Sequence, residues 1–186
     1  AVAAVLLDRR PAGTMRFEYP SRCPACAAGL ESKPGEAAVR CPNSRCPSQR
    51  QRRLEHFASA SAVDIAGLGP ATIGILVREG LVQTPADFYR LRPEDLDGID
   101  GVGPAMAERL LDAIERSKRA ELWRFIYGLG IPRIGVVNSR KLAAACGSLA
   151  AFARLEKARA VEIIGPAAAD PLAEFLARPE VRTELE

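Results

Sequence analysis

The sequence predicts a mainly α-helical fold, an array of helix-hairpin-helix units, preceded by a small β finger held together by a metal ion. Three observations support this prediction: an aliphatic composition, four cysteines in two close pairs, and a glycine motif that recurs four times. Of the 186 residues, 48% are hydrophobic but only 5% are aromatic. This composition is typical of a globular protein with a core of Leu, Ile, Val and Ala, and it argues against a disordered chain.

The first twenty residues predict a strand and a linker. Ala1 to Asp8 is apolar enough for a strand, whereas Pro11, Gly13 and Pro20 interrupt residues 9–20. The apolar start is too short for a membrane span and lacks the basic lead-in of a signal peptide. Because no Met begins the chain, we expect it to be part of a longer protein.

The charge is uneven along the chain. Residues 1–56 hold ten Lys or Arg against five acidic residues, and the remainder holds sixteen against eighteen. The net charge of +3 is too small to identify a nucleic-acid partner, and a solvated surface accounts for it equally well.

The four cysteines predict a structural zinc site. Cys23 and Cys26 form one close pair, Cys41 and Cys46 form a second, and fourteen residues separate the pairs. Zinc takes four thiolates in a tetrahedron, and two short loops can each supply two of them. The segment between the pairs is rich in turn residues and suits a small β-hairpin that metal binding would stabilise.

Other uses of these cysteines are less favoured. Nothing marks the chain as secreted, which argues against two disulfides, and the first pair does not open a helix in a βαβ unit, as a redox pair would. An iron–sulfur cluster bound by the four cysteines remains an alternative to zinc. Cys146 stands in an Ala-rich helical segment and is expected to be a buried apolar residue. His56 is expected to be structural, because four thiolates already complete the site.

Local signals place several helix ends. Ser48-Gln49-Arg50-Gln51 has the pattern of a capping box and predicts a helix that runs to about Ser59. Thr84 followed by Pro85 marks a second start. Gly147 is expected to close the helix before it.

The repeat is the most informative feature. Gly67-Leu68-Gly69-Pro70 recurs as Gly101-Val102-Gly103-Pro104, then more weakly as Arg133-Ile134-Gly135-Val136 and as Ile163-Ile164-Gly165-Pro166. The last glycines are 34, 32 and 30 residues apart, and each precedes a helical pattern. This predicts helix, tight glycine turn and helix, four times over.

Such turns suit a DNA backbone. A glycine turn lets a phosphate approach closely, and the backbone N–H groups at the start of the next helix favour an anion. The contact needs no lysine and reads no base. The predicted DNA-binding residues are Gly67, Gly69, Gly101, Gly103, Arg133 and Gly135, with the basic cluster Arg50, Arg52 and Arg53. The alternative for the glycines is that they simply end helices. The alternative for the arginine cluster is a solvated helix face, and the same alternative applies to Arg133, Arg140 and Lys141.

A tetracysteine finger followed by four such units resembles the C-terminal half of bacterial NAD-dependent DNA ligases. The resemblance covers nearly the whole chain. Besides the cysteine pairs, it rests on Arg9-Arg10-Pro11, Leu54-Glu55-His56-Phe57, Val63 to Gly69, Thr84 to Leu91 and Gly128 to Gly135.

The resemblance implies three regions: the end of an OB domain with a linker at 1–20, a zinc finger at 21–47, and a helix-hairpin-helix DNA-binding domain at 48–186. It implies a bacterial cytoplasmic, nucleoid-associated protein that holds nicked double-stranded DNA across the minor groove during replication and repair. Sealing would use NAD, magnesium and a K-x-D-G lysine. This sequence has no such motif. We therefore expect no catalytic residue and no activity alone, with the adenylation and OB domains as partners.

The chain departs from the family at three places, one of which is the linker Ala151 to Val161, which is short for the family. Ala60 stands where the family usually has a basic residue. The fourth repeat lacks its first glycine and carries Pro171 in its predicted second helix, which should be kinked or begin late and is not expected to contact DNA.

Two rival functions remain. A non-enzymatic DNA-binding module of a repair or recombination protein would use the same hairpins. A base-excision glycosylase would place a catalytic Asp after a hairpin and flip a base into a pocket. Asp112 and Lys118 are its candidates here, but both lie in an amphipathic helical pattern, where surface roles are favoured.

Overall fold

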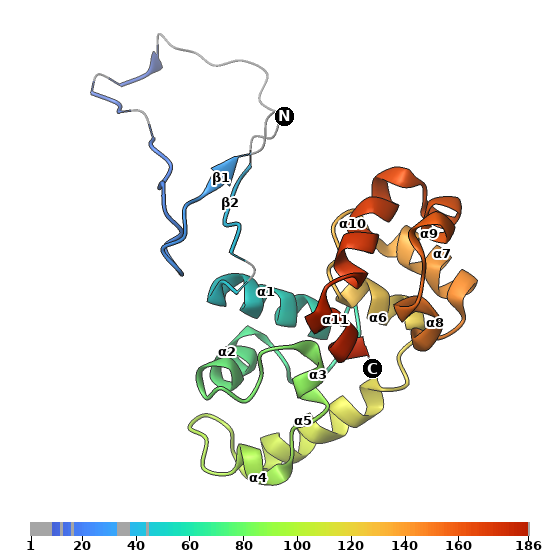
Figure 1. The fold of residues 1–186 in the computed structure, drawn as a ribbon. Coiled ribbons are helices and arrows are strands. Elements are labelled where there is room, and N and C mark those ends of the chain that lie inside the picture. Colours follow the sequence, from blue (N-terminus) through green and yellow to red (C-terminus); the bar gives the residue numbers. More distant parts are fainter. Residues whose placement is uncertain (1–8, 12, 16, 33–37, 44, 186) are drawn as a thin grey trace. The chain divides into compact units, whose positions relative to one another are not determined.

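The computed structural model describes residues 9–11, 13–15, 17–32, 38–43 and 45–185, so the strand predicted at residues 1–8 lies outside the described residues. The chain divides into two compact units, Ala1–Cys46 and Pro47–Glu186. Figure 1 draws both as ribbons.

The N-terminal unit contains the expected small hairpin. Strand β1 (Glu31–Ser32) pairs antiparallel with β2 (Val39–Arg40), with Glu31 opposite Arg40. An isolated antiparallel bridge joins Arg22 to Gly29. Between residues 9 and 20 the described chain has no strand and little helix, as the breakers predict. These few backbone pairs cannot form a core, so the unit depends on its cysteines.

The C-terminal unit is helical over its described residues. Its helices are α1 (Pro47–Ala58), α2 (Pro70–Arg78), α3 (Pro85–Phe88), α4 (Pro93–Leu96), α5 (Pro104–Ser117), α6 (Leu122–Gly128), α7 (Val136–Cys146), α8 (Leu149–Ala153), α9 (Lys157–Ile164), α10 (Pro166–Leu176) and α11 (Pro179–Leu185). No helix among the described residues is long and apolar enough to cross a membrane.

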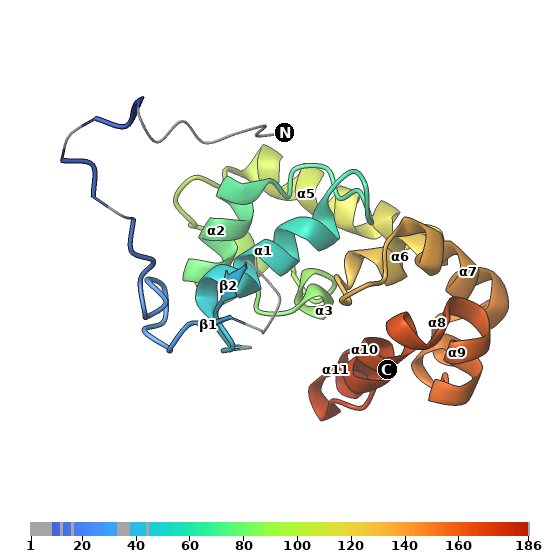
Figure 2. The ribbon, with the colours of Figure 1, turned by 90° about the horizontal axis from the view of Figure 1, so that it is seen from above.

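Two apolar cores hold this unit together. The first lies among α1 to α5 and includes the fully buried Phe57, Phe88 and Leu110. The second lies among α6 to α11 and includes Phe152 and Leu172. Figure 2 shows the corresponding two groups of helices, with α6 between them. The core therefore consists mainly of aliphatic residues, as the composition predicts.

The local helix signals are confirmed with one shift. Helix α1 begins at Pro47, so Ser48 lies inside its first turn rather than before it. At α3, the Asp87 carboxylate accepts hydrogen bonds from the backbone N–H of Thr84 at 2.9 Å and of Gln83 at 3.0 Å. Gly147 ends α7 with a φ of +69°, and its N–H donates to the Ala143 carbonyl. Left-handed backbone of this kind favours glycine.

Of the two outcomes expected for the fourth hairpin's second helix, a kink or a late start, the late start is wrong. Helix α10 begins at Pro166, directly after Gly165, and continues through Pro171 to Leu176. A proline inside a helix removes one backbone hydrogen bond. Burial of Ala168, Ala169 and Leu172 in the second core keeps this segment helical in spite of that loss.

Candidate zinc site and nucleic-acid interface

The four cysteine sulfur atoms converge on one point. Each lies within 4.8 Å of the other three, and the Cys23–Cys46 and Cys26–Cys41 pairs are 3.8 and 3.5 Å apart. A tetrahedral zinc ion with Zn–S bonds of about 2.3 Å needs its sulfur atoms about 3.8 Å apart. All four thiols are free rather than joined in disulfides. The donor set and its spacing therefore fit zinc.

Tight turns place these sulfur atoms. The Cys23 N–H donates to the Ala28 carbonyl at 2.8 Å, and the Ala27 N–H donates back to the Cys23 carbonyl. Ala27 has a φ of +57°, so the chain reverses sharply after Cys26. The Cys46 N–H donates to the Asn43 carbonyl and forms a similar turn at the second pair.

The cluster is electrostatically unequal. A hydrogen bond from the Ala28 backbone lowers the pKa of Cys26 to about 6, and the Asn43 side chain acts in the same direction. Burial, with smaller contributions from the neighbouring thiols, raises the pKa of Cys41 to about 12, although a hydrogen bond from the Asn43 backbone acts in the opposite direction. Four thiolates cannot share this space without a cation, because their charges repel. A divalent metal supplies that positive charge.

The repeat forms three closely similar bends. In bend 1 (residues 65–69) the Leu68 N–H donates to the Ile65 carbonyl. Bend 2 (99–103) and bend 3 (131–135) repeat this bond between their equivalent residues, at 3.0 Å in both. The third position of the turn has a positive φ in every case, at Gly67, Gly101 and Arg133. The glycine that ends each bend is directly followed by α2, α5 or α7.

The last glycine of each bend leaves the start of its helix open. Gly69, Gly103 and Gly135 have φ values of −82°, −76° and −86°, which any residue adopts. A Cβ atom added at any of them would meet nothing within 4 Å. The space above these helix starts is therefore free for a ligand, and glycine is not needed there for the backbone.

The fourth copy differs from these three. Its Gly165 has a φ of +78° and its N–H donates to the Val161 carbonyl, so α9 runs directly into α10 without the turn. We call the four units hairpins 1 (α1–α2), 2 (α4–α5), 3 (α6–α7) and 4 (α9–α10). The missing first glycine of the fourth repeat does not by itself explain this difference, because the third repeat has Arg133 at that position and still forms the turn.

The basic residues singled out in the sequence lie in two places. Arg50, Arg52 and Arg53 lie on α1, where Arg50 is half-buried and Arg52 pairs with Glu55 at 3.3 Å. Arg133 lies exposed in bend 3, with its backbone carbonyl bonded by the Asn138 side chain at 3.1 Å. The two groups belong to hairpins 1 and 3.

Two contacts were not predicted from the sequence. The Arg124 guanidinium donates to the carbonyls of Ala60 and Ala62 at 3.0 and 2.8 Å, and the Arg140 guanidinium lies 4.6 Å from the centre of the Trp123 ring. The residues that make these two contacts are far apart in sequence or belong to no motif. The spacing of residues along the chain therefore could not predict the contacts.

The remaining candidates take structural or surface roles. The His56 Nε2 lies 2.9 Å from the Tyr127 carbonyl, and the two rings pack edge to face, as expected for a structural histidine. Cys146 is half-buried against the second core, and burial raises its pKa. Asp112 is exposed on α5, and Lys118 pairs with Glu115. The glycosylase candidates thus do not converge on a pocket.

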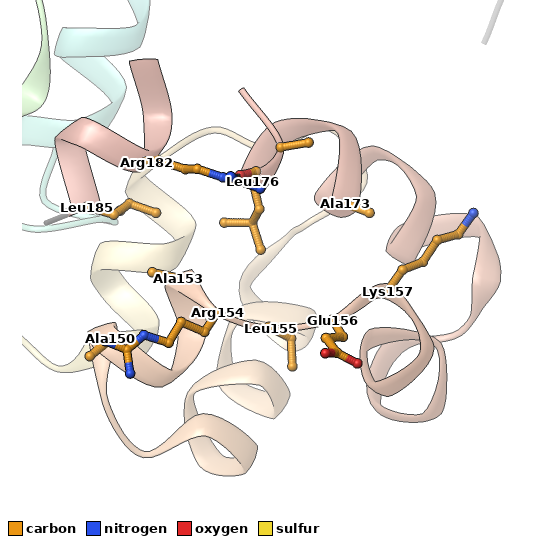
Figure 3. A pocket seen from close by; sticks show the side chains of 11 residues that line it. Ala150, Ala153, Arg154, Leu155, Glu156, Lys157, Ala173, Leu176, Arg182 and Leu185 are labelled. Atoms are coloured by element: carbon orange, nitrogen blue, oxygen red, sulfur yellow. The ribbon is translucent and has the colours of Figure 1, made fainter. Parts of the chain in front are cut away.

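A cavity of about 690 Å³ lies among α8, α10, α11 and the segment before α9. Figure 3 shows its side chains, which combine Ala and Leu with Arg154, Lys157 and Arg182. Glu156 is the only acidic residue among the described residues of the lining, and Lys157 is paired with Asp170 at 2.9 Å. The described lining residues include no nucleophile beside a base, the arrangement that covalent catalysis uses.

Comparison with known proteins agrees with this geometry. Residues 22–47 match the NAD-dependent DNA ligase C4 zinc finger domain, residues 61–116 match the SAM-like helix-hairpin-helix tandem, and residues 124–185 match the helix-hairpin-helix motif. The finger match covers all four clustered cysteines, and the other two cover the four glycine motifs.

Curated relatives extend the match to the whole chain. DNA ligase of Chloroflexus aggregans is 42% identical over 100% of the chain, and that of Pelotomaculum thermopropionicum is 45% identical over 97%. The chain spans about 28% of the length of the former and 27% of the latter. It therefore belongs to the NAD-dependent DNA ligase family and corresponds to the zinc-finger and helix-hairpin-helix part of its members.

Proposed function

We propose that this chain holds nicked double-stranded DNA by its backbone while a ligase seals the nick, in the replication and repair of bacterial DNA. The single observation that carries the proposal is the threefold bend whose terminal glycine leaves a helix start open. Amide N–H groups at a helix start bind anions, and DNA presents phosphates at regular intervals. Family membership names the substrate class.

The proposed contacts are the backbone amides of the bends, assisted by nearby cations. They comprise Gly67, Gly69, Gly101, Gly103, Arg133 and Gly135, with Arg50, Arg52 and Arg53 on α1. Such contacts position the duplex without reading its sequence. The protein is accordingly a general nick-holding module, acting in the bacterial cytoplasm on nucleoid DNA.

The zinc ion has a structural role in this proposal. Cys23, Cys26, Cys41 and Cys46 are its proposed ligands, since they fill a tetrahedral zinc ion and leave no open position for water. The chemistry of sealing, with NAD, magnesium and a catalytic lysine, is assigned to the adenylation and OB domains of the family's full-length enzymes. We assign residues 1–20 to the end of that OB domain and its linker.

Binding to nicked, intact and single-stranded DNA at several salt concentrations tests the proposal. Nicked and intact duplex should bind more tightly than the single strand, because the bends are spaced on a rigid scaffold and need regularly placed phosphates. The logarithm of the binding constant should fall with the logarithm of salt by about 0.9 for each phosphate neutralised. Preference for the single strand, or a slope near zero, would contradict the proposal.

A non-enzymatic DNA-binding module is the second candidate. It would bind the same DNA through the same bends, so binding data cannot separate the two. Complementation of a strain with a ligase defect, by the gene that encodes this chain with its natural flanking sequence, would distinguish them. Only the ligase would restore sealing.

A further inference from the structure

We propose that hairpins 1 and 3 are the DNA-gripping pair, and that hairpin 2 serves chiefly as their scaffold. This inference rests on the proposed function and specifies which of the bends performs it. Three observations carry it: the charge of each hairpin, the residues in each bend, and a direct joint between hairpins 1 and 3.

The hairpins differ sharply in charge. Hairpin 3, residues 122–146, has four basic residues and no acidic one, and hairpin 1, residues 47–78, has four against two. Hairpin 2, residues 93–117, has seven acidic residues against two basic ones, and hairpin 4, residues 157–176, has three against two. A phosphate backbone is therefore attracted by hairpins 1 and 3 and repelled by hairpin 2.

The difference extends to the bends. The second residue of the turn is Ala66 in bend 1, Pro132 in bend 3 and Asp100 in bend 2. Asp100 and the nearby Asp97 are exposed. Because Asp100 belongs to bend 2 itself, a phosphate bound to the amides of that bend would be repelled by its carboxylate, and repulsion between unit charges over a few ångströms offsets an amide hydrogen bond. Bend 3 instead carries the exposed Arg133.

Hairpin 3 also holds a cation in a fixed position. Arg140 is exposed on α7, and its guanidinium stacks over Trp123, the chain's single tryptophan, from α6. An arginine that already has one conformation loses less entropy when it binds a phosphate. With Arg133 in bend 3 and Lys141 on α7, Arg140 gives hairpin 3 three exposed cations.

Hairpin 2 has a clear packing role. A Cβ atom added at Gly101 would lie 3.1 Å from the Ile75 side chain of α2, and one added at Gly67 would lie 3.7 Å from the Leu110 side chain of α5. Bends 1 and 2 are thus packed against each other's second helices. Val102 and Leu110 are buried in the core that supports α1 and α2. Hairpin 2 therefore supports hairpin 1, and its own bend makes the weakest of the three DNA contacts.

A joint between α1 and α6 links the two gripping hairpins. Arg124 of α6 donates to the Ala60 and Ala62 carbonyls just after α1, and the Tyr127 carbonyl meets His56. A Cβ atom at Gly128 would lie 3.0 Å from the Phe57 ring, so the two helices approach closely. The spacing between bends 1 and 3 is consequently set by this joint.

Three matched variants test the inference: Gly69→Gln, Gly103→Gln and Gly135→Gln. All three positions have an ordinary negative φ and open space, so the substitution is equally tolerated by the fold and differs only in what it faces. Thermal unfolding of each variant checks this assumption. Binding of the full chain, loaded with zinc, to a nicked duplex is measured by fluorescence anisotropy.

We expect G69Q and G135Q to weaken binding roughly tenfold or more, since each loses charged hydrogen bonds to phosphate. G103Q should weaken binding by a smaller factor, about threefold, because the acidic residues of hairpin 2 already weaken the contact at bend 2. Equal losses in all three, or a loss in G103Q alone, would overturn this inference and leave the proposed function standing. No loss in any variant would overturn the proposed use of the bends itself.

Discussion

Replacing Arg124 with methionine tests how strongly the α1–α6 joint holds the helical unit together. The Arg124 side chain is 31% exposed, and its guanidinium bonds two backbone carbonyls in the loop after α1. Methionine keeps most of the aliphatic stem but removes every donor. The change therefore keeps the packing of the stem and removes the two hydrogen bonds, together with the ion pair to Glu121 at 4.0 Å and the contact of the guanidinium with the Trp123 ring. The exposed ion pair contributes little to stability.

The size of the effect follows from those bonds. A hydrogen bond from a charged group contributes about 1.5 to 3 kcal/mol, and water can reach the Ala60 carbonyl once the guanidinium is gone. The Ala62 residue is fully buried, so its carbonyl suffers the larger loss. We expect the free energy of unfolding to fall by about 2 kcal/mol, which corresponds to a drop of roughly 8 °C in Tm for a unit of this size.

Urea unfolding followed by circular dichroism measures this quantity, with Arg116→Met as the control. Arg116 is exposed on α5 and lies beside the same surface hollow as Arg124. Its side chain makes no ion pair or hydrogen bond with the described part of the chain. Its replacement should change the free energy by less than about 0.5 kcal/mol. If R124M and R116M unfold alike, the joint does not depend on Arg124 and the reasoning is refuted.

Three further predictions concern zinc, a helix end and a cap. Chelation of zinc should expose residues 21–46 to protease while the helical signal of residues 47–186 persists, because the two form separate units; protection of that segment after chelation would be the contrary result in a mass-spectrometric digest. Gly147→Ala should cost about 1 to 2 kcal/mol in urea unfolding, since Gly147 is left-handed, whereas Gly103→Ala, with a negative φ, should cost less than 1. Asp87→Ala should cost about 1 kcal/mol at pH 7. Although burial opposes it, the bonds from Gln83 and Thr84 lower the pKa of Asp87. The stability that this carboxylate contributes is thus complete above the ordinary Asp pKa of about 3.9 and is lost as the pH falls through the lower folded value. A difference between D87A and the unmodified chain that persists in full at pH 2 would contradict this.

Much of the local structure could be predicted because its causes lie within a few residues. The cap at Thr84, the stop at Gly147 and the bends before α2 and α5 depend on backbone conformations that particular residues favour. The late start expected for α10 was wrong for the complementary reason. Pro171 disfavours a helix locally, but burial of its neighbours in the second core outweighs that cost.

The zinc site shows the same division. The pairing of cysteines in the sequence indicated four ligands, and the structure brings their sulfur atoms within 4.8 Å of one another. The unequal pKa values of Cys26 and Cys41 were not predictable, because they arise from the Ala28 backbone and from burial that only the folded loops create.

The sequence alone determined the family, the cysteine cluster and the repeated bends, because spacing along the chain carries that information. Tertiary structure alone decided which hairpins adjoin. Arg124 reaches Ala62 across 62 positions of sequence, and Gly128 meets Phe57 only because α1 and α6 pack together. Such contacts depend on how apolar faces fit in three dimensions, and no local rule specifies that fit.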